Sequence, residues 1–276
     1  MAKGTLYVVS TPIGNLEDIT LRAIRILKEV DVIAAEDTRH TLKLLNYYGI
    51  SKPLISYWGE KERAKAEEVI GRLRTGNSVA LVSDAGTPGI SDPGSVLIKR
   101  AIEEDIQVVP VPGPTALIAA LTISGFSTEE FVFCGFLPAK QSQRRKFLEE
   151  LSLERRTVVI YESPHRVLES MAEIADTFGE RSMVLAKEMT KLHEEVLRGT
   201  VSGVFASLGE SKIVGEYVMV IEGNRGVESG HREGDAIKEI RSLMRKGLGR
   251  KDAVKRVAEQ YGLSRKELYD RSLEGE

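Results

Sequence analysis

Residues 83–94 read SDAGTPGISDPG and directly follow the apolar run SVALV. A connection from a strand to a helix usually needs roughly two to six residues, and this one is longer and rich in glycine and proline. Glycines let a ligand approach the backbone closely, and prolines hold a loop in one shape before the ligand binds. Asp84 offers a carboxylate to hydroxyls or to a cation. The loop therefore predicts a binding site for a polar ligand of medium size.

Five further loops follow other apolar runs and contain similar residue types. They are TPIGN at 11–15, EDTRH at 36–40, VPGPTAL at 111–117, YESPHR at 161–166 and KEMTK at 187–191. Ligands of open α/β sheets bind beside the carboxyl ends of the strands. Turn formation alone would explain glycine, proline and aspartate in any one of these loops. Their shared position after strands favours one common site.

The sequence lacks the usual signatures of phosphate and metal sites. Neither G-x-G-x-x-G after the first strand nor G-x-x-x-x-G-K-[ST] occurs, so dinucleotide and P-loop sites lose their main support. The four histidines are scattered, and the spacing of Asp84 and Asp92 does not match a calcium loop. Cys134 lies inside an apolar run, which argues against a cysteine nucleophile. We therefore expect no metal site.

The loops need a scaffold, and the first part of the chain alternates short apolar runs with segments of helical periodicity. This alternation predicts a mostly parallel sheet with helices on its faces, in an N-terminal α/β domain over residues 1–112. The expected strands are 6–10, 32–35, 53–58, 78–83 and 106–111, and the expected helices are 21–30, 41–48, 60–74 and 95–103.

A second α/β domain is expected over residues 113–224. Pro112 and Pro114 bracket Gly113 and end one element before a new helix starts. Apolar runs then recur, and the expected strands are 131–136, 157–163, 182–188 and 216–223.

The remaining residues lose strand character. The stretch 224–234 predicts a flexible linker, and residues 235–276 predict a small all-helical region. Within it, residues 253–269 predict a helix, a tight turn at 261–264 and a second helix capped by Ser264, which is a helix-turn-helix pattern. We expect such a tail to bind RNA backbone.

Composition restricts the class of protein further. The formal net charge is −2, so affinity for nucleic acid must come from local patches. A single cysteine cannot form an internal disulfide, which favours a reducing compartment. The start MAKGTLYVV leaves no room for a signal peptide, and the longest apolar stretch, at 116–126, is too short to span a bilayer. A soluble, cytoplasmic protein with no membrane partner is expected.

Taken together, these blocks resemble the tetrapyrrole methylase superfamily and, within it, the ribosomal RNA small-subunit methyltransferase I branch. The resemblance covers roughly residues 4–223 and runs through YVVSTPIGNLEDITLRA, AAEDTRHT, SDAGTPGISDPG, VPGPTAL, CGFLP, YESPHR and AKEMTK. It implies two α/β domains, S-adenosylmethionine bound in the cleft between them, and a homodimer. It also implies methylation of the ribose 2′-hydroxyl of a cytidine in the decoding region of small-subunit ribosomal RNA, either as free RNA or in the assembled subunit.

The resemblance also implies which residues contact the cofactor. They lie in the matched blocks and are Pro12, Asp84, Gly86, Thr87, Thr115 and Ala116, with Tyr161 and Glu162 from the second domain.

One block departs from the superfamily pattern and affects the choice of substrate. Corrin- and porphyrin-type relatives commonly have G-P-G-D-P after the first strand, where this chain has PIGNLED. The change points away from a tetrapyrrole substrate. Two alternatives stay open: a small-molecule methyltransferase acting on a tetrapyrrole or corrinoid, and a non-catalytic RNA-binding assembly factor on a methylase scaffold.

Methyl transfer to a ribose hydroxyl would benefit from a general base within hydrogen-bond reach. Candidates at strand ends are Glu36, Asp37 and Glu188, while Lys187 or Arg39 could hold a phosphate or stabilise a developing alkoxide. A helix N-cap explains the EDTR stretch equally well, and a surface ion pair explains Lys187 and Glu188. The sequence does not single out one base.

Two stretches are basic enough to bind RNA phosphates, although a solvated helix face would look the same. The candidates after CGFLP are Lys140, Arg144, Arg145 and Lys146. Those in the tail are Arg245, Lys246, Arg250, Lys251, Lys255 and Arg256.

Overall fold

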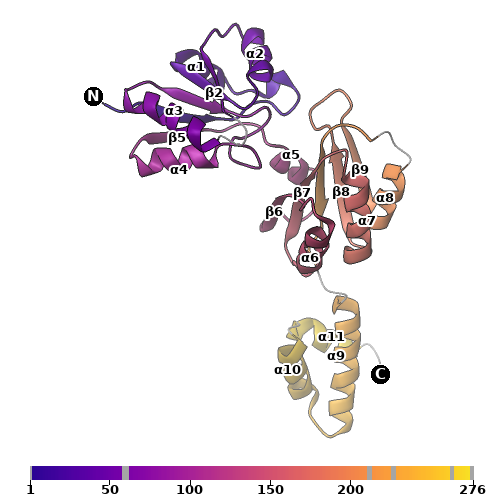
Figure 1. Ribbon diagram of the computed structural model, residues 1–276. Coiled ribbons are helices and arrows are strands. Elements are labelled where there is room, and N and C mark those ends of the chain that lie inside the picture. Colours follow the sequence, from indigo (N-terminus) through magenta and orange to yellow (C-terminus); the bar gives the residue numbers. More distant parts are fainter. Residues whose placement is uncertain (1, 58–61, 210–212, 225–227, 262–263, 274–276) are drawn as a thin grey trace. The chain divides into compact units, whose positions relative to one another are not determined.

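The computed structural model describes residues 2–57, 62–209, 213–224, 228–261 and 264–273. Its first half is built on a five-stranded sheet in which every pair of neighbouring strands is parallel (Figure 1). The strands, in spatial order, are β3 (Leu54–Ser56), β2 (Val32–Ala35), β4 (Val79–Val82), β1 (Thr5–Val9) and β5 (Gln107–Val111). The central strands β2 and β4 are buried along their whole length, as the runs VIAA and VALV require in a sheet covered on both faces.

Helices cover both faces of this first sheet. On one face, the core contains Ile26 and Leu27 of α1 (Leu21–Glu29) and Leu44 and Leu45 of α2 (Thr38–Tyr47). On the other face lie α3 (Glu62–Arg74) and α4 (Ser95–Glu103). The short 3₁₀ helix η1 (Leu16–Asp18) precedes α1, whose N-cap Thr20 accepts a hydrogen bond from the Ala23 N–H.

The second half carries another five-stranded sheet, but of mixed direction. Of its four pairs of neighbouring strands, the pair at the β6 edge is parallel and the other three are antiparallel. In spatial order the strands are β6 (Phe131–Phe136), β7 (Thr157–Glu162), β10 (Tyr217–Ile221), β8 (Ser182–Lys187) and β9 (Glu195–Thr200). One face packs against α6 (Gln141–Leu151), α7 (Val167–Phe178) and α8 (Val201–Gly209), and the other packs against α5 (Ala116–Thr122).

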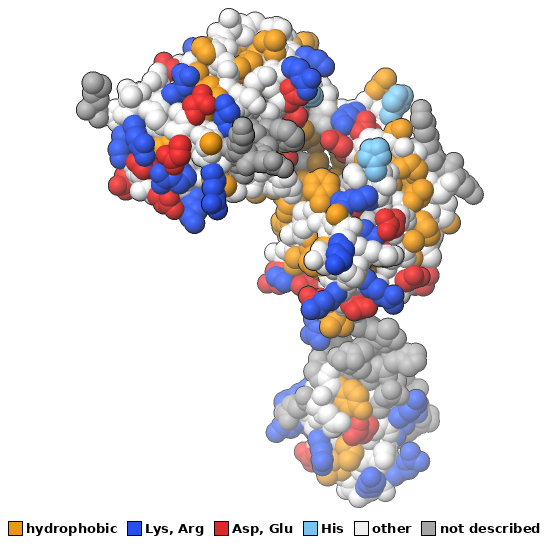
Figure 2. Space-filling view, in the orientation of Figure 1, with side chains coloured by type: hydrophobic (Ala, Val, Ile, Leu, Met, Phe, Trp, Pro, Cys, Tyr) orange, Lys and Arg blue, Asp and Glu red, His pale blue; other side chains and the backbone are white. Residues whose placement is uncertain are grey.

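Residues 223–276 form a separate compact unit of helices. They are α9 (Glu228–Arg245), α10 (Arg250–Tyr261) and α11 (Arg265–Leu273). Ala236, Ile240, Val254, Val257 and Leu268 are buried in a core of the unit's own. Lys and Arg side chains are spread over its surface in Figure 2. No helix in the described ranges is both long and apolar enough to cross a membrane.

Most expected elements are present, and three expectations need correction. The second sheet contains one more strand than expected, β9, which the sequence did not indicate because EVLRGT alternates weakly and is half exposed. α2 begins at Thr38, three residues earlier than expected, because Asp37 caps it. The expected flexible linker 224–234 is wrong from Glu228 onward, where α9 begins. Part of the expected turn at 261–264 lies outside the described residues.

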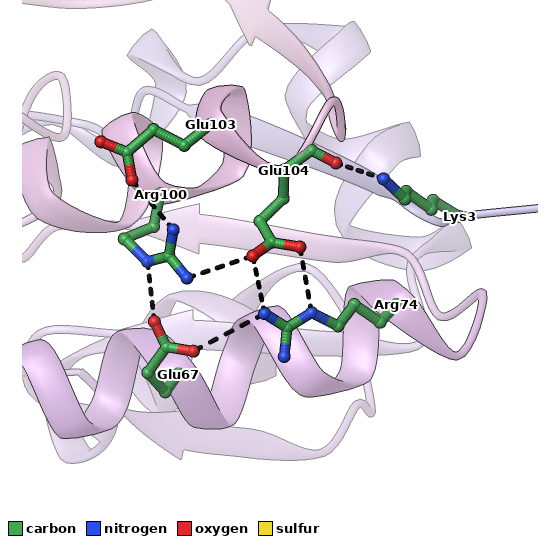
Figure 3. A network of polar contacts seen from close by, with 6 residues as sticks. All are labelled: Lys3, Glu67, Arg74, Arg100, Glu103 and Glu104. Carbon is green, nitrogen blue, oxygen red and sulfur yellow. Dashed lines mark hydrogen bonds and ion pairs between the residues drawn. The ribbon is translucent and has the colours of Figure 1, made fainter.

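Helices α3 and α4 are joined by a network of ion pairs (Figure 3). Arg100 binds Glu67 at 2.7 Å and Glu103 at 2.9 Å, and Arg74 binds Glu104 at 2.7 Å. Lys3 reaches the same cluster through the Glu104 carbonyl oxygen. The pKa of Glu104 is lowered to about 2. The largest cause is the hydrogen bonding from Arg74, and the positive charges of Arg74 and Arg100 add to it.

This lowered pKa predicts a pH-dependent contribution to stability. A carboxyl whose pKa is lowered by folding stabilises the protein above its ordinary pKa of 4.5, and the contribution is lost as the pH falls towards 2. We expect Glu104→Gln to lower the melting temperature at pH 7 and the deficit to shrink between pH 5 and pH 2. Thermal unfolding across this pH range measures both. A deficit that stays constant with pH would contradict the assignment.

Candidate active site

Backbone pairing holds the loops after β1 and β4 together. The Thr11 N–H donates to the Gly86 carbonyl at 2.8 Å, and the Gly86 N–H donates to the Thr11 carbonyl at 3.0 Å. The Thr11 hydroxyl donates to the Ser83 carbonyl, and the Ser10 and Thr87 hydroxyls are 2.8 Å apart. Gly86 has φ +75°, a backbone conformation that is strained for any residue with a side chain. The glycine at this position is therefore required for the pairing.

The loop after β5 lies against the same two loops. A Cβ at Gly113 would come within 2.8 Å of the Ser10 Cβ, so the close approach needs glycine there. The Thr87 hydroxyl is 3.5 Å from the Pro114 carbonyl oxygen. Three of the loops that the sequence singles out thus meet at the carboxyl ends of adjacent strands.

A cavity of about 330 Å³ opens at this junction. It is lined from the first half by the loops after β1, β4 and β5, and from the second half by the ends of β6, β7, β8 and β10. Its apolar wall includes Ile13, Ile90, Phe136, Met189 and Val218. Mostly apolar walls with a few polar groups are typical of small-molecule sites.

Tyr161 anchors the second-half wall of the cavity. Its hydroxyl accepts a hydrogen bond from the Leu117 N–H at 2.9 Å, which ties β7 to the start of α5. Its ring packs edge-on against Phe133 and Phe136, with centroids 4.8 and 5.8 Å away. Burial raises the pKa of the Tyr161 hydroxyl, so it stays neutral at physiological pH.

Acidic side chains gather where β2 and β4 end. The Asp84 N–H donates to the Glu36 carboxylate at 3.2 Å, and the Asp84 carboxylate accepts from the Asp37 N–H at 3.0 Å. Burial raises the pKa of Glu36. Burial, together with the nearby Glu36 and Asp84 charges, raises the pKa of Asp92 to about 7. Asp92 lines the cavity and so can exchange a proton there near neutral pH.

The expected cofactor residues fall into two groups. Gly86, Thr87, Thr115, Ala116, Tyr161 and Glu162 line the cavity. The Glu162 carboxylate is nevertheless fully buried and bound by Ser163 N–H, the Ser170 hydroxyl and Arg166. Pro12 and Asp84 do not line it, although each is next to a residue that does.

The expected catalytic residues are mostly engaged elsewhere. Asp37 caps α2 by accepting from the Arg39 N–H at 2.8 Å, and it also binds the Arg39 guanidinium. The Lys187 ammonium is 3.3 Å from Glu195. Glu188 is partly buried, but hydrogen bonds from Lys191 and the Glu216 N–H outweigh that burial and lower its pKa.

Several cavity residues were not singled out from the sequence. Phe136 and Met189 lie within the matched blocks, but no pattern ranked them above their neighbours, and Asp92 was considered only as a cation ligand together with Asp84. Cys134 is half-buried, and burial raises the pKa of its thiol to about 11, which leaves it unreactive. No group of His, Cys, Asp and Glu in the described part of the chain could hold a metal ion.

The structure corrects the expectation that Arg144 contacts RNA. Its side chain is 1% exposed and binds Glu173 at 2.8 Å and Glu169 at 2.5 Å. The neighbouring Lys140, Arg145 and Lys146 are exposed. In the tail, Arg245, Lys246, Lys251, Lys255 and Arg256 are exposed and Arg250 is half-buried.

The fold has solved counterparts. Uroporphyrin-III C-methyltransferase from Thermus thermophilus, complexed with S-adenosyl homocysteine, matches with a TM-score of 0.58 and 20% identity over 79% of this chain and 97% of that chain. Cobalt precorrin-4 methyltransferase matches with a TM-score of 0.58 and 18% identity over 79% and 94%. Residues 5–204 also match the family model of the tetrapyrrole (corrin/porphyrin) methylases. The chain is thus a methyltransferase of the tetrapyrrole methylase class.

Curated relatives define the family more narrowly, because they match along the whole chain. Proteins named ribosomal RNA small subunit methyltransferase I are 47% identical in Synechocystis and 41% identical in Bacillus subtilis. These matches cover 98% of both chains in the first case, and 97% of this chain and 93% of the relative in the second. Residues 232–276 match the RsmI C-terminal HTH domain. The chain belongs to the ribosomal RNA small subunit methyltransferase I family.

The burial of Arg144 predicts a structural role that its neighbour does not share. Removing one partner of a buried ion pair leaves an uncompensated charge, which costs roughly 3–5 kcal/mol. Because Glu169 is half exposed, we expect Arg144→Ala to lose about 3 kcal/mol of unfolding free energy. Arg145→Ala, at a side chain 77% exposed, should change it by less than about 1 kcal/mol. Urea denaturation measures both variants, and equal losses would refute the assignment.

Proposed function

We propose that this protein transfers the methyl group of S-adenosylmethionine to the ribose 2′-hydroxyl of a cytidine in the decoding region of 16S ribosomal RNA. The observation that carries the proposal is the cavity, which is formed by the matched blocks of both halves. The names of the full-length relatives support a small-subunit ribosomal RNA substrate. The superfamily resemblance supports the cytidine and its 2′-hydroxyl.

The cavity fits a cationic nucleoside cofactor. A Cβ at Gly86 would point at Ile13 and Pro114, at 3.5 and 3.8 Å, so glycine keeps the space between these loops open. Apolar side chains suit an adenine and an aliphatic chain, and the acidic Glu216 suits a positive charge. Gly86, Thr87, Thr115, Ala116 and Tyr161 would hold the cofactor, which supplies an electrophilic methyl group when bound. Pro12 and Asp84, which do not line the cavity, would help to hold these loops in position.

Asp92 is the residue we assign to proton transfer. A ribose hydroxyl must lose its proton as it attacks, and a carboxylate with a pKa near the working pH is an efficient acceptor. Asp92 lines the cavity and has the raised pKa that this role needs. Glu36 also has a raised pKa, but its carboxylate accepts from the Asp84 N–H and does not line the cavity.

The helical unit formed by residues 223–276 would add affinity for the substrate. Its exposed Lys and Arg side chains can contact phosphates irrespective of sequence. Exposed Lys140, Arg145 and Lys146 would add to this affinity. A ribosomal substrate, as free RNA or as the assembled small subunit, implies action in the cytoplasm. The superfamily resemblance adds a homodimer to the proposal.

The activity can be tested by incubating the protein with S-adenosylmethionine labelled in its methyl group. We expect label in the ribose of a cytidine when small-subunit particles or their naked RNA are the acceptor. Label in a corrinoid precursor instead would support a tetrapyrrole methyltransferase. RNA binding without label in either acceptor would support an assembly factor.

A pair of glycine variants tests whether the cavity holds the cofactor. Gly86 and Gly179 have φ +75° and +64°, so alanine at either position costs about 1–2 kcal/mol of backbone strain. Only Gly86 lines the cavity. We expect Gly86→Ala to weaken S-adenosylmethionine binding by about tenfold or more in calorimetry and Gly179→Ala to leave it unchanged. Equal affinity of the two variants would place the cofactor elsewhere.

The role of Asp92 predicts a pH dependence. A base must be deprotonated to act, so kcat should rise as the pH increases through about 7. We expect Asp92→Asn to lower kcat by on the order of 10²-fold or more, to flatten this pH dependence, and to leave the cofactor Kd within a few-fold of the original. A variant that loses cofactor affinity but keeps kcat would show that Asp92 binds the cofactor instead.

A further inference from the structure

The outer surface of α2 presents a set of side chains suited to a single-stranded nucleic acid. The α2 outer surface consists of the six exposed residues of the helix: the polar or aromatic Arg39, His40, Lys43, Asn46 and Tyr47, and the apolar Leu42. The helix contains no Asp or Glu. Single-strand binding sites combine cations along the backbone of the nucleic acid with aromatic rings on which bases stack. Both kinds of group are present here on one helix.

This surface begins at the rim of the cavity. Asp37, which caps α2, donates its N–H to Asp84, and the acidic cluster around Asp84 includes the cavity residue Asp92. The helix then runs from Arg39 to Tyr47, which at a rise of about 1.5 Å per residue is roughly 12 Å. A strand that enters the cavity with its target nucleotide can therefore lay its neighbouring nucleotides along α2.

Tyr47 is held in place for stacking. Its side chain is 62% exposed, which is unusual for so large a ring. Its ring lies edge-on to Tyr48, with centroids 4.9 Å apart and planes at 79°. The Tyr48 hydroxyl in turn donates to the Leu16 carbonyl, which fixes that ring against η1. The Tyr47 ring is therefore already ordered, and stacking a base on it would cost little side-chain entropy.

The cations of α2 have fewer acidic partners than those on the opposite face of the sheet. On α3 and α4, Arg74 and Arg100 are neutralised by three glutamates in the network of Figure 3. On α2, Arg39 binds Asp37 and is still 88% exposed, and Lys43 has no ion pair among the described residues. His40 lies close enough to Glu36 for its charge to lower the pKa of that carboxyl. Figure 2 shows Lys and Arg side chains over this end of the first half, with acidic side chains next to them. Because α2 itself contains no Asp or Glu, its own outer surface favours a polyanion.

We propose that the α2 outer surface binds the ribosomal RNA strand beside the target nucleotide, with Arg39, His40 and Lys43 on phosphates and Tyr47 stacked on a base. This inference rests on the proposed function and adds the path by which the substrate strand reaches the cavity. The residues are substrate-binding groups and take no part in the chemistry.

The test uses full-length variants and naked small-subunit ribosomal RNA as the probe. We expect Tyr47→Ala to weaken binding by roughly 5- to 150-fold, the range for loss of one stacked base, and Tyr47→Phe to retain it. Lys43→Ala should reduce the slope of log affinity against log salt by about 0.7, the value for one phosphate contact on a single strand. S-adenosylmethionine affinity should stay unchanged in all three variants.

Lys99→Ala is the matched control, because Lys99 is 77% exposed on α4 across the sheet. If the α2 variants bind and methylate RNA as Lys99→Ala does, the path is wrong while the proposed function stands. If the original protein methylates no RNA, the proposed function itself fails. If the α2 variants lose affinity for assembled particles but not for naked RNA, α2 contacts a ribosomal protein and the proposal is overturned.

Discussion

The pairing of Thr11 with Gly86 is the contact on which the site depends. Two reciprocal backbone hydrogen bonds hold the loop after β1 against the loop after β4, and the left-handed backbone at Gly86 makes them possible. Because β1 pairs with both β4 and β5, the loop after β5 is brought to the same place, where Gly113 allows it to approach Ser10 closely. The loops that form the cavity wall from the first half are thus held together mainly by contacts between their main chains. Polar side chains need only be added at the edge of this wall.

Neighbouring carboxyl groups at that edge raise one another's pKa values. Carboxylates from the ends of β2 and β4 lie close together with partial burial, so they cannot all be ionised at little cost. The protein tolerates this because backbone N–H groups of Asp37 and Asp84 stabilise two of the carboxylates. In the described part of the chain no backbone N–H donates to the Asp92 carboxylate, and its pKa is the one raised to about 7.

The sequence predicted the scaffold better than it predicted individual side chains. Buried runs such as VIAA and VALV are typical of strands in a sheet covered on both faces, so the described ends of the elements in the first half were predictable to within three residues. β9 was missed because an exposed edge strand needs little hydrophobic pattern. In the sequence, Arg144 cannot be distinguished from its exposed basic neighbours. Its burial follows from the positions of Glu169 and Glu173, which the sequence does not show. Likewise, no local pattern separates Asp92 from Asp84.

The two sheets also place different demands on the folding chain. β1 occupies residues 5–9 but pairs with residues 79–81 and 107–111, so its partners become available only when most of the first half has been synthesised. β8 and β9, by contrast, are antiparallel neighbours separated by a short loop. Contacts between residues far apart in sequence slow folding. The parallel pairing of β1, and with it the cavity wall at Thr11 and Gly86, should therefore form more slowly than the local pairing of β8 with β9.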